Sequence, residues 1–310
     1  DAFVGSAAHH DIASGVGAHS ARTLPLVRQA LDDEDYRKAE ELQRALQGHY
    51  SEAYQPLGTL TIEHPDGETV SHYERTLDIS HAVASVSCLR DGKRYQAEYY
   101  VSAPDSALIV EIRAEGGTDL VIRLDSHLPH EVSVEGNAAV SDGYVAWHSY
   151  PGYYGGAKEQ FMYDPDRGVH FRTIVSVADA DGTLSATHGQ LRLEGCSRAR
   201  IMLVNATSFN GFDKDPVREG RDYKALAGER MARLQGSDSK TLRKRHERDY
   251  LSLFDGVELY LGETDPSLKA LPTDVQLRRY ADSLDDNPEL EALYFQYGRY
   301  LLISSSRTSG

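Results

Sequence analysis

The middle of the chain alternates apolar and polar residues with a period of two. The pattern is clearest over 94–102, 107–115 and 169–177. In the first of these segments the residues of one parity are apolar or aromatic, namely Tyr95, Ala97, Tyr99 and Val101. Residues 200–206 are apolar on both faces instead. Because successive side chains of a strand point to opposite faces of a sheet, the alternating segments predict half-buried strands, and 200–206 predicts a central strand.

Glycine-containing turn sequences separate these segments. Asp-Gly or a close variant of it occurs at 64–67, 90–92, 115–117, 141–143 and 179–182. Asp-Gly favours the tight turns of antiparallel hairpins, because glycine adopts a positive φ at little cost. Many short strands without intervening helices predict a large antiparallel β-sandwich, so the fold class is mainly β with an α extension.

Helical periodicity replaces the alternation towards both ends of the chain. Residues 24–47 place Ala39, Leu42 and Leu46 on one stripe, behind the acidic residues of 32–35 that are typical of a helix start. Four later segments are also predicted to be helices, from their periodicity or from a capping residue at their start. They are 216–235, 238–254, 273–284 and the residues from 287 onward. Between them, "GVELYL" at 256–261 predicts one more short strand.

The last helix is apolar around most of its circumference. Asn287 is a suitable N-cap, and Pro288 stands at the first helical position, where a missing N–H costs nothing. One face carries Leu290, Leu293, Tyr294, Tyr297 and Leu301, and further apolar residues occupy the other faces. A helix on the surface of a single domain buries one stripe, so this pattern predicts burial on more than one side.

These patterns divide the chain into four parts. We expect an irregular and helical N-terminal segment over 1–50, in which 1–19 are irregular or mobile. A β-sandwich domain follows over 51–212. A helical linker with a short strand covers 213–272, and a further helical segment covers 273–310. With 310 residues, the chain is long enough for about two domains.

Charge and composition exclude some classes of partner. The chain has 33 basic and 48 acidic residues, a net charge of −15, which argues against a nucleic acid or an anionic membrane surface as partner. No run of about 18 apolar residues predicts a membrane span. The first residues do not resemble a signal peptide. Localisation is left open, with cytoplasmic and secreted as the two alternatives. Cys88 and Cys196 fit no metal spacing and are expected to be buried free thiols, with one disulfide as the alternative.

Several acidic segments are candidates for site chemistry. Residues 179–182 resemble the start of a calcium loop, but Gln190 stands where that motif needs a Glu, so a hairpin turn is favoured. The Asp pairs of 164–166 and 213–215 are either paired carboxylates of a glycosidase or turn residues beside proline. The histidines show no metal-ligand spacing, and we expect no metal and no cofactor.

The loop 145–156 holds the chain's one tryptophan among other aromatic residues. Aromatic faces bind the C–H faces of sugars, and histidine hydrogen-bonds hydroxyl groups. The candidates for substrate contact are therefore Trp147, His148, Tyr153 and Tyr154. The alternative is a loop that is pinned by its own aromatic side chains.

Five collinear motifs carry a resemblance to a known family. They are "YQPLGTL" at 54–60, "YERTLDISHAVASV" at 73–86, "NATSFNGFDKDP" at 205–216, "HERDYLSLFDGVELYL" at 246–261 and "ELEALYFQYGRYLLISSSR" at 289–307. Together they resemble glycoside hydrolase family 95, which contains α-L-fucosidases. The resemblance runs from about residue 24 to 310, and its last motif is the most specific.

The resemblance implies an N-terminal β-sandwich of the galactose mutarotase super-sandwich kind, a helical linker and an (α/α)6 catalytic barrel. Residues 273–310 would then be the start of that barrel, truncated at Gly310. It also implies an inverting hydrolase for terminal α-1,2-linked L-fucose. The family's catalytic residues are expected downstream of Gly310, so none is carried onto this chain, which would be inactive alone.

Other functions remain open at this point. The sandwich could be a carbohydrate-binding or structural module, or the enzyme could act on α-L-galactosides, which differ by one hydroxyl group. The partners implied are a fucosylated oligosaccharide substrate and a catalytic barrel segment that this chain does not contain.

Overall fold

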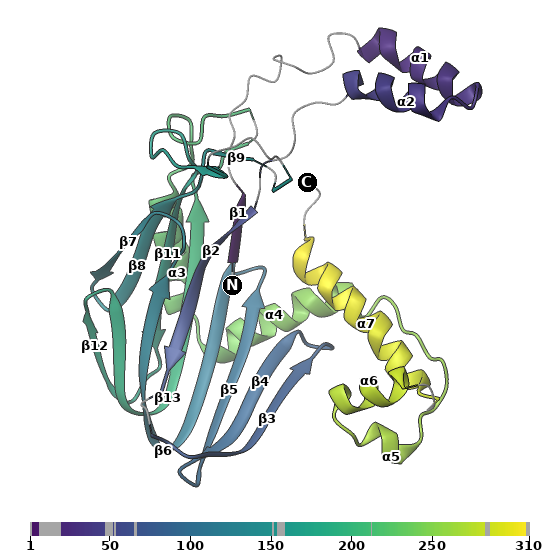
Figure 1. Ribbon diagram of the computed structural model, residues 1–310. Coiled ribbons are helices and arrows are strands. Elements are labelled where there is room, and N and C mark those ends of the chain that lie inside the picture. The colour runs from purple at the N-terminus through teal and green to yellow at the C-terminus, as the bar shows by residue number, and fades with distance from the viewer. Residues whose placement is uncertain are drawn as a thin grey trace.

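The structure, a computed structural model (Figure 1), describes residues 2–5, 20–46, 52, 54–64, 67–150, 152–153, 159–211, 213–282 and 286–307. A large antiparallel sheet occupies the middle of the chain, and helices lie before and after it. The predicted fold class is confirmed.

The strands follow the alternating segments of the sequence closely. In chain order the strands of the main sheet are β1 (Ala2–Gly5), β2 (Tyr54–Glu63), β3 (Val70–Asp78), β4 (Val83–Arg90), β5 (Lys93–Ser102), β6 (Ala107–Asp125), β7 (His130–Glu135), β8 (Ala138–Tyr144), β11 (His170–Ala178), β12 (Thr183–Thr187) and β13 (Gln190–Thr207). They lie side by side as β3-β4-β5-β6-β13-β11-β8-β7, while β2 joins β6, β12 joins β13 and β1 joins β2. Each of these pairs is antiparallel, and the predicted central strand 200–206 lies in β13, between β6 and β11.

Two long strands bend the sheet into a sandwich. β6 and β13 pair from Ala107–Val204 at one end to Arg123–Gln190 at the other, with register shifts around Cys196. Glycines at positive φ mark the bend, Gly116 and Gly117 in β6 and Gly195 in β13. The core confirms the two layers, because residues from beyond the bend pack with residues from before it. This core includes Val110, Ile112, Leu120, Ile122, Leu191, Leu193 and Ile201.

The other face of the sheet is covered by two helices. α3 (Tyr223–Gln235) and α4 (Ser239–Phe254) begin at Asp222 and Asp238, whose carboxylates accept hydrogen bonds from backbone N–H groups in the first turn. Their apolar stripes form a second core with the opposite face of β6, β11 and β13, and with residues of β4, β5 and β8. That core includes Ile109, Ile174, Met202, Val204, Met231, Leu234 and Leu242.

The C-terminal helices form a separate group, drawn in yellow-green to yellow in Figure 1. It contains α5 (Pro266–Lys269), α6 (Thr273–Ala281) and α7 (Pro288–Ser305). Asn287 caps α7 as predicted, since its side chain accepts a hydrogen bond from the Leu290 N–H at 3.1 Å. Leu290 is the buried residue of α7; the helix's other large apolar side chains are partly or largely exposed, Tyr294 at 77% and Leu302 at 64%. Within the described residues, α7 therefore lacks the burial on several sides that its sequence predicts.

One arginine connects α7 to the end of α4. The Arg299 guanidinium donates to the carbonyl oxygens of Leu253, Phe254 and Val257, at 3.2, 2.8 and 2.9 Å. The last carbonyls of a helix have no partner within it, so the arginine satisfies groups that α4 leaves open. Val257 belongs to the segment predicted as a short strand, and that prediction is wrong. Residues 257–261 form no strand, and α7 side chains hold the segment instead.

The N-terminal segment differs from expectation in one respect. Residues 1–19 were expected to be irregular, but Ala2–Gly5 form β1, which pairs with β2. Farther along, α1 (Ser20–Asp32), α2 (Tyr36–Gln43) and the short helix η1 (Arg44–Leu46) occupy the predicted helical region. Asp35 caps α2 through the Lys38 N–H, and Ala39 packs with Val27 and Ala30.

Two predicted turns are not turns. Residues 90–92 connect the hairpin of β4 and β5 as expected, but 115–117 lie inside β6 and 141–143 lie inside β8. The predicted hairpin at 179–182 is also wrong, because these residues join β11 to β12, and both strands pair with β13 rather than with each other. Gly143 is needed for a close approach rather than for a turn, because a Cβ there would collide with the Pro129 carbonyl oxygen and the Phe171 ring. Cys88 and Cys196 are buried free thiols, as predicted.

We expect Gly143→Ala to destabilise the protein by roughly 1–3 kcal/mol, because the added methyl group overpacks a filled space. Its Cβ would lie 2.5 Å from Cζ of Phe171. Gly228→Ala in α3 is the matched control, since nothing lies within 4 Å of its Cβ position. There the change should stabilise by about 0.5–1 kcal/mol, because alanine favours a helix over glycine. Urea unfolding of both variants checks this, and equal effects would contradict it.

Candidate functional site

The aromatic loop leaves the sheet after β8 and is built on a small ribbon. β9 (His148–Ser149) pairs with β10 (Phe161–Met162). The Trp147 N–H donates to the Met162 carbonyl oxygen at 2.9 Å, and the Tyr150 N–H donates to that of Gln160 at 2.8 Å. Backbone pairing therefore fixes the base of the loop, including two of its four predicted contact residues.

A carboxylate from elsewhere in the chain holds this base. Oε1 of Glu52 lies 2.8 Å from Nδ1 of His148, and Oε2 accepts hydrogen bonds from the N–H and Oγ of Ser149, at 2.6 and 2.9 Å. His148 is buried, and its ring also packs edge-on against Tyr150, with the ring centroids 4.6 Å apart. Buried polar groups need partners, and a carboxylate with several donors is among the stronger ones. The His148 imidazole thus anchors the loop.

The Trp147 ring is also engaged. The guanidinium carbon of Arg167 lies 3.3 Å from the ring centroid, in the arrangement of a cation–π contact that covers one face of the indole. Trp147 and His148 are neighbours, with centroids 5.4 Å apart. Tyr153 is 85% exposed, and Tyr154 lies outside the described residues. Of the predicted contact residues, Trp147 and His148 make internal contacts and Tyr153 faces solvent.

Sequence reasoning missed Glu52 and Arg167, which hold the loop. Glu52 precedes His148 by 96 residues, so no local pattern connects them. Arg167 follows the turn of residues 164–166, where the Asp164 carboxylate accepts the Asp166 N–H at 2.9 Å. Arg167 is likewise distant from Trp147 in the sequence, so no local pattern identified this pair.

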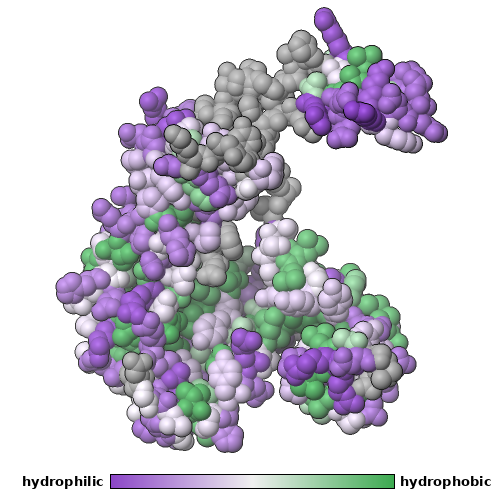
Figure 2. Space-filling model, in the orientation of Figure 1, coloured by the Kyte–Doolittle hydropathy of each residue, from purple (hydrophilic) through white to green (hydrophobic). Residues whose placement is uncertain are grey.

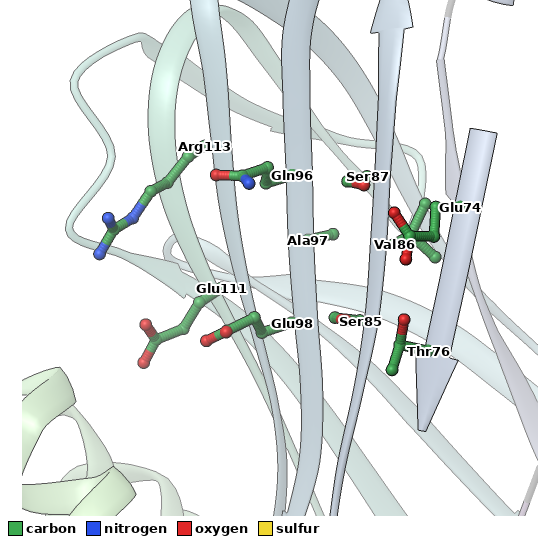
Figure 3. Close-up of a pocket in the computed structure, with 10 residues that line it drawn as sticks. All are labelled: Glu74, Thr76, Ser85, Val86, Ser87, Gln96, Ala97, Glu98, Glu111 and Arg113. Atoms are coloured by element: carbon green, nitrogen blue, oxygen red, sulfur yellow. The ribbon is translucent and has the colours of Figure 1, made fainter. Parts of the chain in front are cut away.

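A second candidate is a polar groove on the helix-covered face of the sheet (Figure 3). Two cross-strand rows line it in register on β3, β4, β5 and β6. The first row is Glu74, Ser87, Gln96 and Arg113, and the second is Thr76, Ser85, Glu98 and Glu111. The groove encloses about 320 Å³ and mixes hydrogen-bond donors with carboxylate acceptors. Such a surface can bind hydroxyl groups or water.

The groove's carboxylates are engaged with nearby groups. Glu98 forms an ion pair with Arg243 of α4 at 3.1 Å, and Glu111 accepts from the Tyr100 hydroxyl at 3.5 Å. Burial and the neighbouring Glu111 carboxylate raise the pKa of Tyr100. The lining is open to solvent, and Glu74 and Gln96 are exposed. We assign these residues no catalytic role.

A third candidate is the cleft between the sheet and the C-terminal helices. It encloses about 340 Å³ and is bounded by Tyr99 of β5, Tyr250 of α4 and Tyr300 of α7. Asp249 and Arg307 form an ion pair in its lining. Apolar side chains gather beside this hollow and on the C-terminal helices in Figure 2. The cleft is an interface between the sandwich and the helical group.

The predicted acidic candidates lie in connecting segments, where their carboxylates accept hydrogen bonds from nearby groups. Oxygens of the Asp181 carboxylate accept from Oγ and N–H of Ser197, at 2.5 and 2.8 Å, and these bonds lower its pKa to about 2. Asp215 likewise accepts from the Val217 and Arg218 N–H groups. In the part of the chain that is described, no cluster of three His, Cys, Asp or Glu side chains could hold a metal ion. None of the described helices is long and apolar enough to span a membrane.

Two family models match the chain in succession. Residues 5–211 match "Glycosyl hydrolase family 65, N-terminal domain", and residues 238–310 match "Glycosyl hydrolase family 95 catalytic domain". The first match covers the sandwich, and the second begins at α4. The chain belongs to glycoside hydrolase family 95, with an N-terminal domain of the family 65 kind. The family predicted from the five motifs is confirmed.

Curated relatives are similar to this chain along most of its length. "Alpha-L-fucosidase 2" of Arabidopsis thaliana is 30% identical over 296 residues, which are 92% of this chain and 35% of that protein. "Probable alpha-fucosidase A" of Aspergillus oryzae is 25% identical over 83% of this chain and 35% of its own length. The chain therefore spans about a third of these relatives.

A solved structure is similar in part. It is a "Putative kojibiose phosphorylase from human microbiome", with a TM-score of 0.43 and 8% identity, and the match covers 65% of this chain and 28% of that one.

Arg167→Ala should expose the face of Trp147 that the guanidinium covers. We expect collisional quenching of the tryptophan fluorescence by acrylamide to rise about twofold, because one face of the ring loses its cation–π partner. The chain has one tryptophan, so the signal has a single source. Arg192→Ala, which removes an exposed arginine paired with Glu194, is the control and should leave quenching unchanged. Unchanged quenching in Arg167→Ala would refute the contact.

Proposed function

We propose that this chain is the N-terminal portion of an inverting α-L-fucosidase that hydrolyses terminal α-1,2-linked L-fucose from glycans. The observation that carries the proposal is the pair of successive family matches, over residues 5–211 and 238–310. The similar proteins named as fucosidases support the substrate. In our proposal the residues that perform the reaction lie downstream of Gly310, and residues 1–310 alone are inactive.

The exposed apolar surface of α7 supports this arrangement. Leu293, Tyr294, Phe295, Leu301 and Leu302 are each between 39% and 77% exposed. Soluble proteins rarely leave large apolar side chains gathered on one helix unless another surface covers them. We propose that 273–310 begin the (α/α)6 barrel and that later helices of the barrel pack on α7.

The proposed reaction needs two groups on opposite faces of the fucose ring. A carboxylic acid protonates the leaving oxygen, and a base activates water on the other face. In inverting enzymes the two groups are about 6.5–9.5 Å apart, which leaves room for that water. The part proposed for residues 1–310 is to position the first barrel helix. The Asn287 cap and the Arg299 contacts to α4 hold that helix against the linker.

The proposal predicts no release of fucose from fucosylated lactose by residues 1–310. The intact protein should release it, because only that form would contain the reacting groups. Liberated fucose is measured with each protein at equal concentration, and an α-L-galactoside run in parallel tests the alternative substrate. Turnover by residues 1–310 at the rate of the intact protein would overturn the placement of the active site.

The aromatic loop allows a separate test of sugar binding by the sandwich. Arg167 covers a face of Trp147, and His148 is buried, so we expect the loop to bind no glycan by itself. Titration of residues 1–310 with fucosylated lactose should leave the tryptophan fluorescence unchanged up to about 10 mM. This range is wide enough to detect weak binding, because a site with a Kd near 1 mM would be almost saturated at 10 mM. A saturable change that Tyr153→Ala abolishes would favour a carbohydrate-binding module instead.

A further inference from the structure

A cavity of about 440 Å³ lies between the two layers of the sandwich, beside β2. Leu57–Leu60 of β2 form one wall, together with Leu124 from the end of β6 that pairs with β2. Inward side chains of β5, β6, β8, β11 and β13 form the facing wall. Few voids inside proteins are larger than a water molecule, so a cavity of this size is a candidate binding site.

Most of the cavity lining is apolar. On the facing wall, Val101 of β5, Leu108 of β6 and Leu203 of β13 are cross-strand neighbours in one row. They line the cavity together with the leucines of β2. Val101 is 66% exposed, so the cavity reaches the solvent at this end of the row. A molecule can enter here, and leucine side chains would cover its apolar part.

A second row on the same wall is polar. Thr173 of β11 pairs with Ser141 of β8 on one side and with Asn205 of β13 on the other, and all three residues line the cavity. The inward residues before and after Thr173 on β11 are Phe171 and Val175, which are buried in apolar clusters. The polar row is therefore an exception in the interior of the sandwich, and it lies next to the leucine surface.

The middle residue of this polar row has no hydrogen-bond partner. Thr173 is 4% exposed, and its Oγ1 makes no hydrogen bond within the described structure. Roughly nine-tenths or more of the buried polar groups in proteins have a partner. Because Thr173 lines the cavity, a molecule bound there can supply the hydrogen bond that the chain does not.

The charges around the cavity disfavour an anionic ligand. Among the described lining residues there is no Lys, Arg or His, and the one charged residue is Asp125. An anion would have no cationic partner here and would be repelled by the carboxylate. The residues of the polar row instead offer hydroxyl and amide groups, which both donate and accept hydrogen bonds. An uncharged hydroxyl group is the matching partner.

We propose that this cavity is a binding site for a small uncharged alcohol with an apolar ring or a short alkyl body. The body lies against Leu60, Leu108 and Leu203, and the hydroxyl group exchanges hydrogen bonds with Thr173 and its neighbours in the polar row. An engineered cavity of roughly 150 Å³ with a similar lining binds benzene, so a body of at least one six-membered ring fits. The inference concerns the sandwich and does not rest on the proposed fucosidase reaction.

The lining favours this ligand over a sugar or a cluster of water molecules. A free sugar carries hydroxyl groups around its whole ring, and several of them would lie against leucine side chains without a partner. A buried water molecule needs about two to four polar partners, and the leucine wall provides none. A molecule with one apolar part and one hydroxyl group matches both walls.

Titration with three cyclic probes tests the proposal. Cyclohexanol has the proposed body and hydroxyl group, cyclohexanecarboxylate replaces the hydroxyl group by an anion, and myo-inositol carries a hydroxyl group on every ring carbon. Isothermal titration calorimetry should give a Kd of about 1 mM for cyclohexanol, and binding of the other two probes should be at least about tenfold weaker. Residues 1–310 and the intact protein are titrated in parallel.

Methyl NMR spectra locate the bound probe. Cyclohexanol should shift the signals of Val101, Leu108 and Leu203, because their side chains line the cavity. The signals of Leu242 are the internal control and should not move, since this residue packs in the second core under α4. Shifts at Leu242 without shifts at the cavity residues would place the site elsewhere and overturn the proposal.

Thr173→Val separates ligand binding from folding. The hydroxyl group that it removes has no partner in the described structure, so the melting temperature without ligand should not fall. The affinity for cyclohexanol should fall about tenfold. Thr118→Val is the matched control, because the Thr118 Oγ1 lies 3.2 Å from Nδ1 of His64, away from the cavity. There the melting temperature should fall by about 2–4 °C and the affinity should not change.

Four further outcomes would overturn the proposal. The first is no binding of cyclohexanol. The second is equal or tighter binding of myo-inositol, which would indicate a sugar site. The third is an unchanged affinity for cyclohexanol in Thr173→Val. The fourth is binding by residues 1–310 that the intact protein lacks, which would show that another part of the protein occupies the cavity.

Discussion

The fold depends on the antiparallel pairing of β6 with β13. This ladder runs through both layers of the sandwich, so one set of backbone hydrogen bonds fixes the position of each layer relative to the other. The bend at Gly116, Gly117 and Gly195 allows the pair to turn without losing its register beyond a short irregular stretch. The elements around it are placed relative to this pair: β5 and β11 beside it, α3 and α4 on its outer face, and β2 and β12 at its far end.

Much of this architecture could be predicted from the sequence because the signals are local. A strand with one buried face alternates, as 94–102 does, and a cap such as Asn287 satisfies N–H groups within one turn of the helix. The all-round apolar pattern of the last helix was also informative. The pattern predicted that other elements bury α7 on several sides. The exposed apolar side chains of α7 show that the described residues bury only a small part of this helix.

The features that were missed depend on residues far apart in the chain. Gly143 resembled a turn glycine, but its role is set by Phe171 on the next strand. The contact of Glu52 with His148 spans 96 residues and makes an anchor of a side chain that looked suited to sugar binding. The segment 256–261 alternates like a strand, yet none of the described strands pairs with it, and side chains of α7 hold it instead.

The Arg299 contacts have a mechanical consequence. A guanidinium is planar, and here its two terminal nitrogens bond three carbonyl oxygens at the end of α4. Such a fork resists twisting as well as separation, so α7 cannot rotate about its own axis without breaking several bonds at once. α4 in turn packs on the sheet through Leu242. The angle at which α7 leaves the sandwich is therefore set largely by the end of its neighbouring helix, and a force on α7 would be transmitted to the β-sheet through α4.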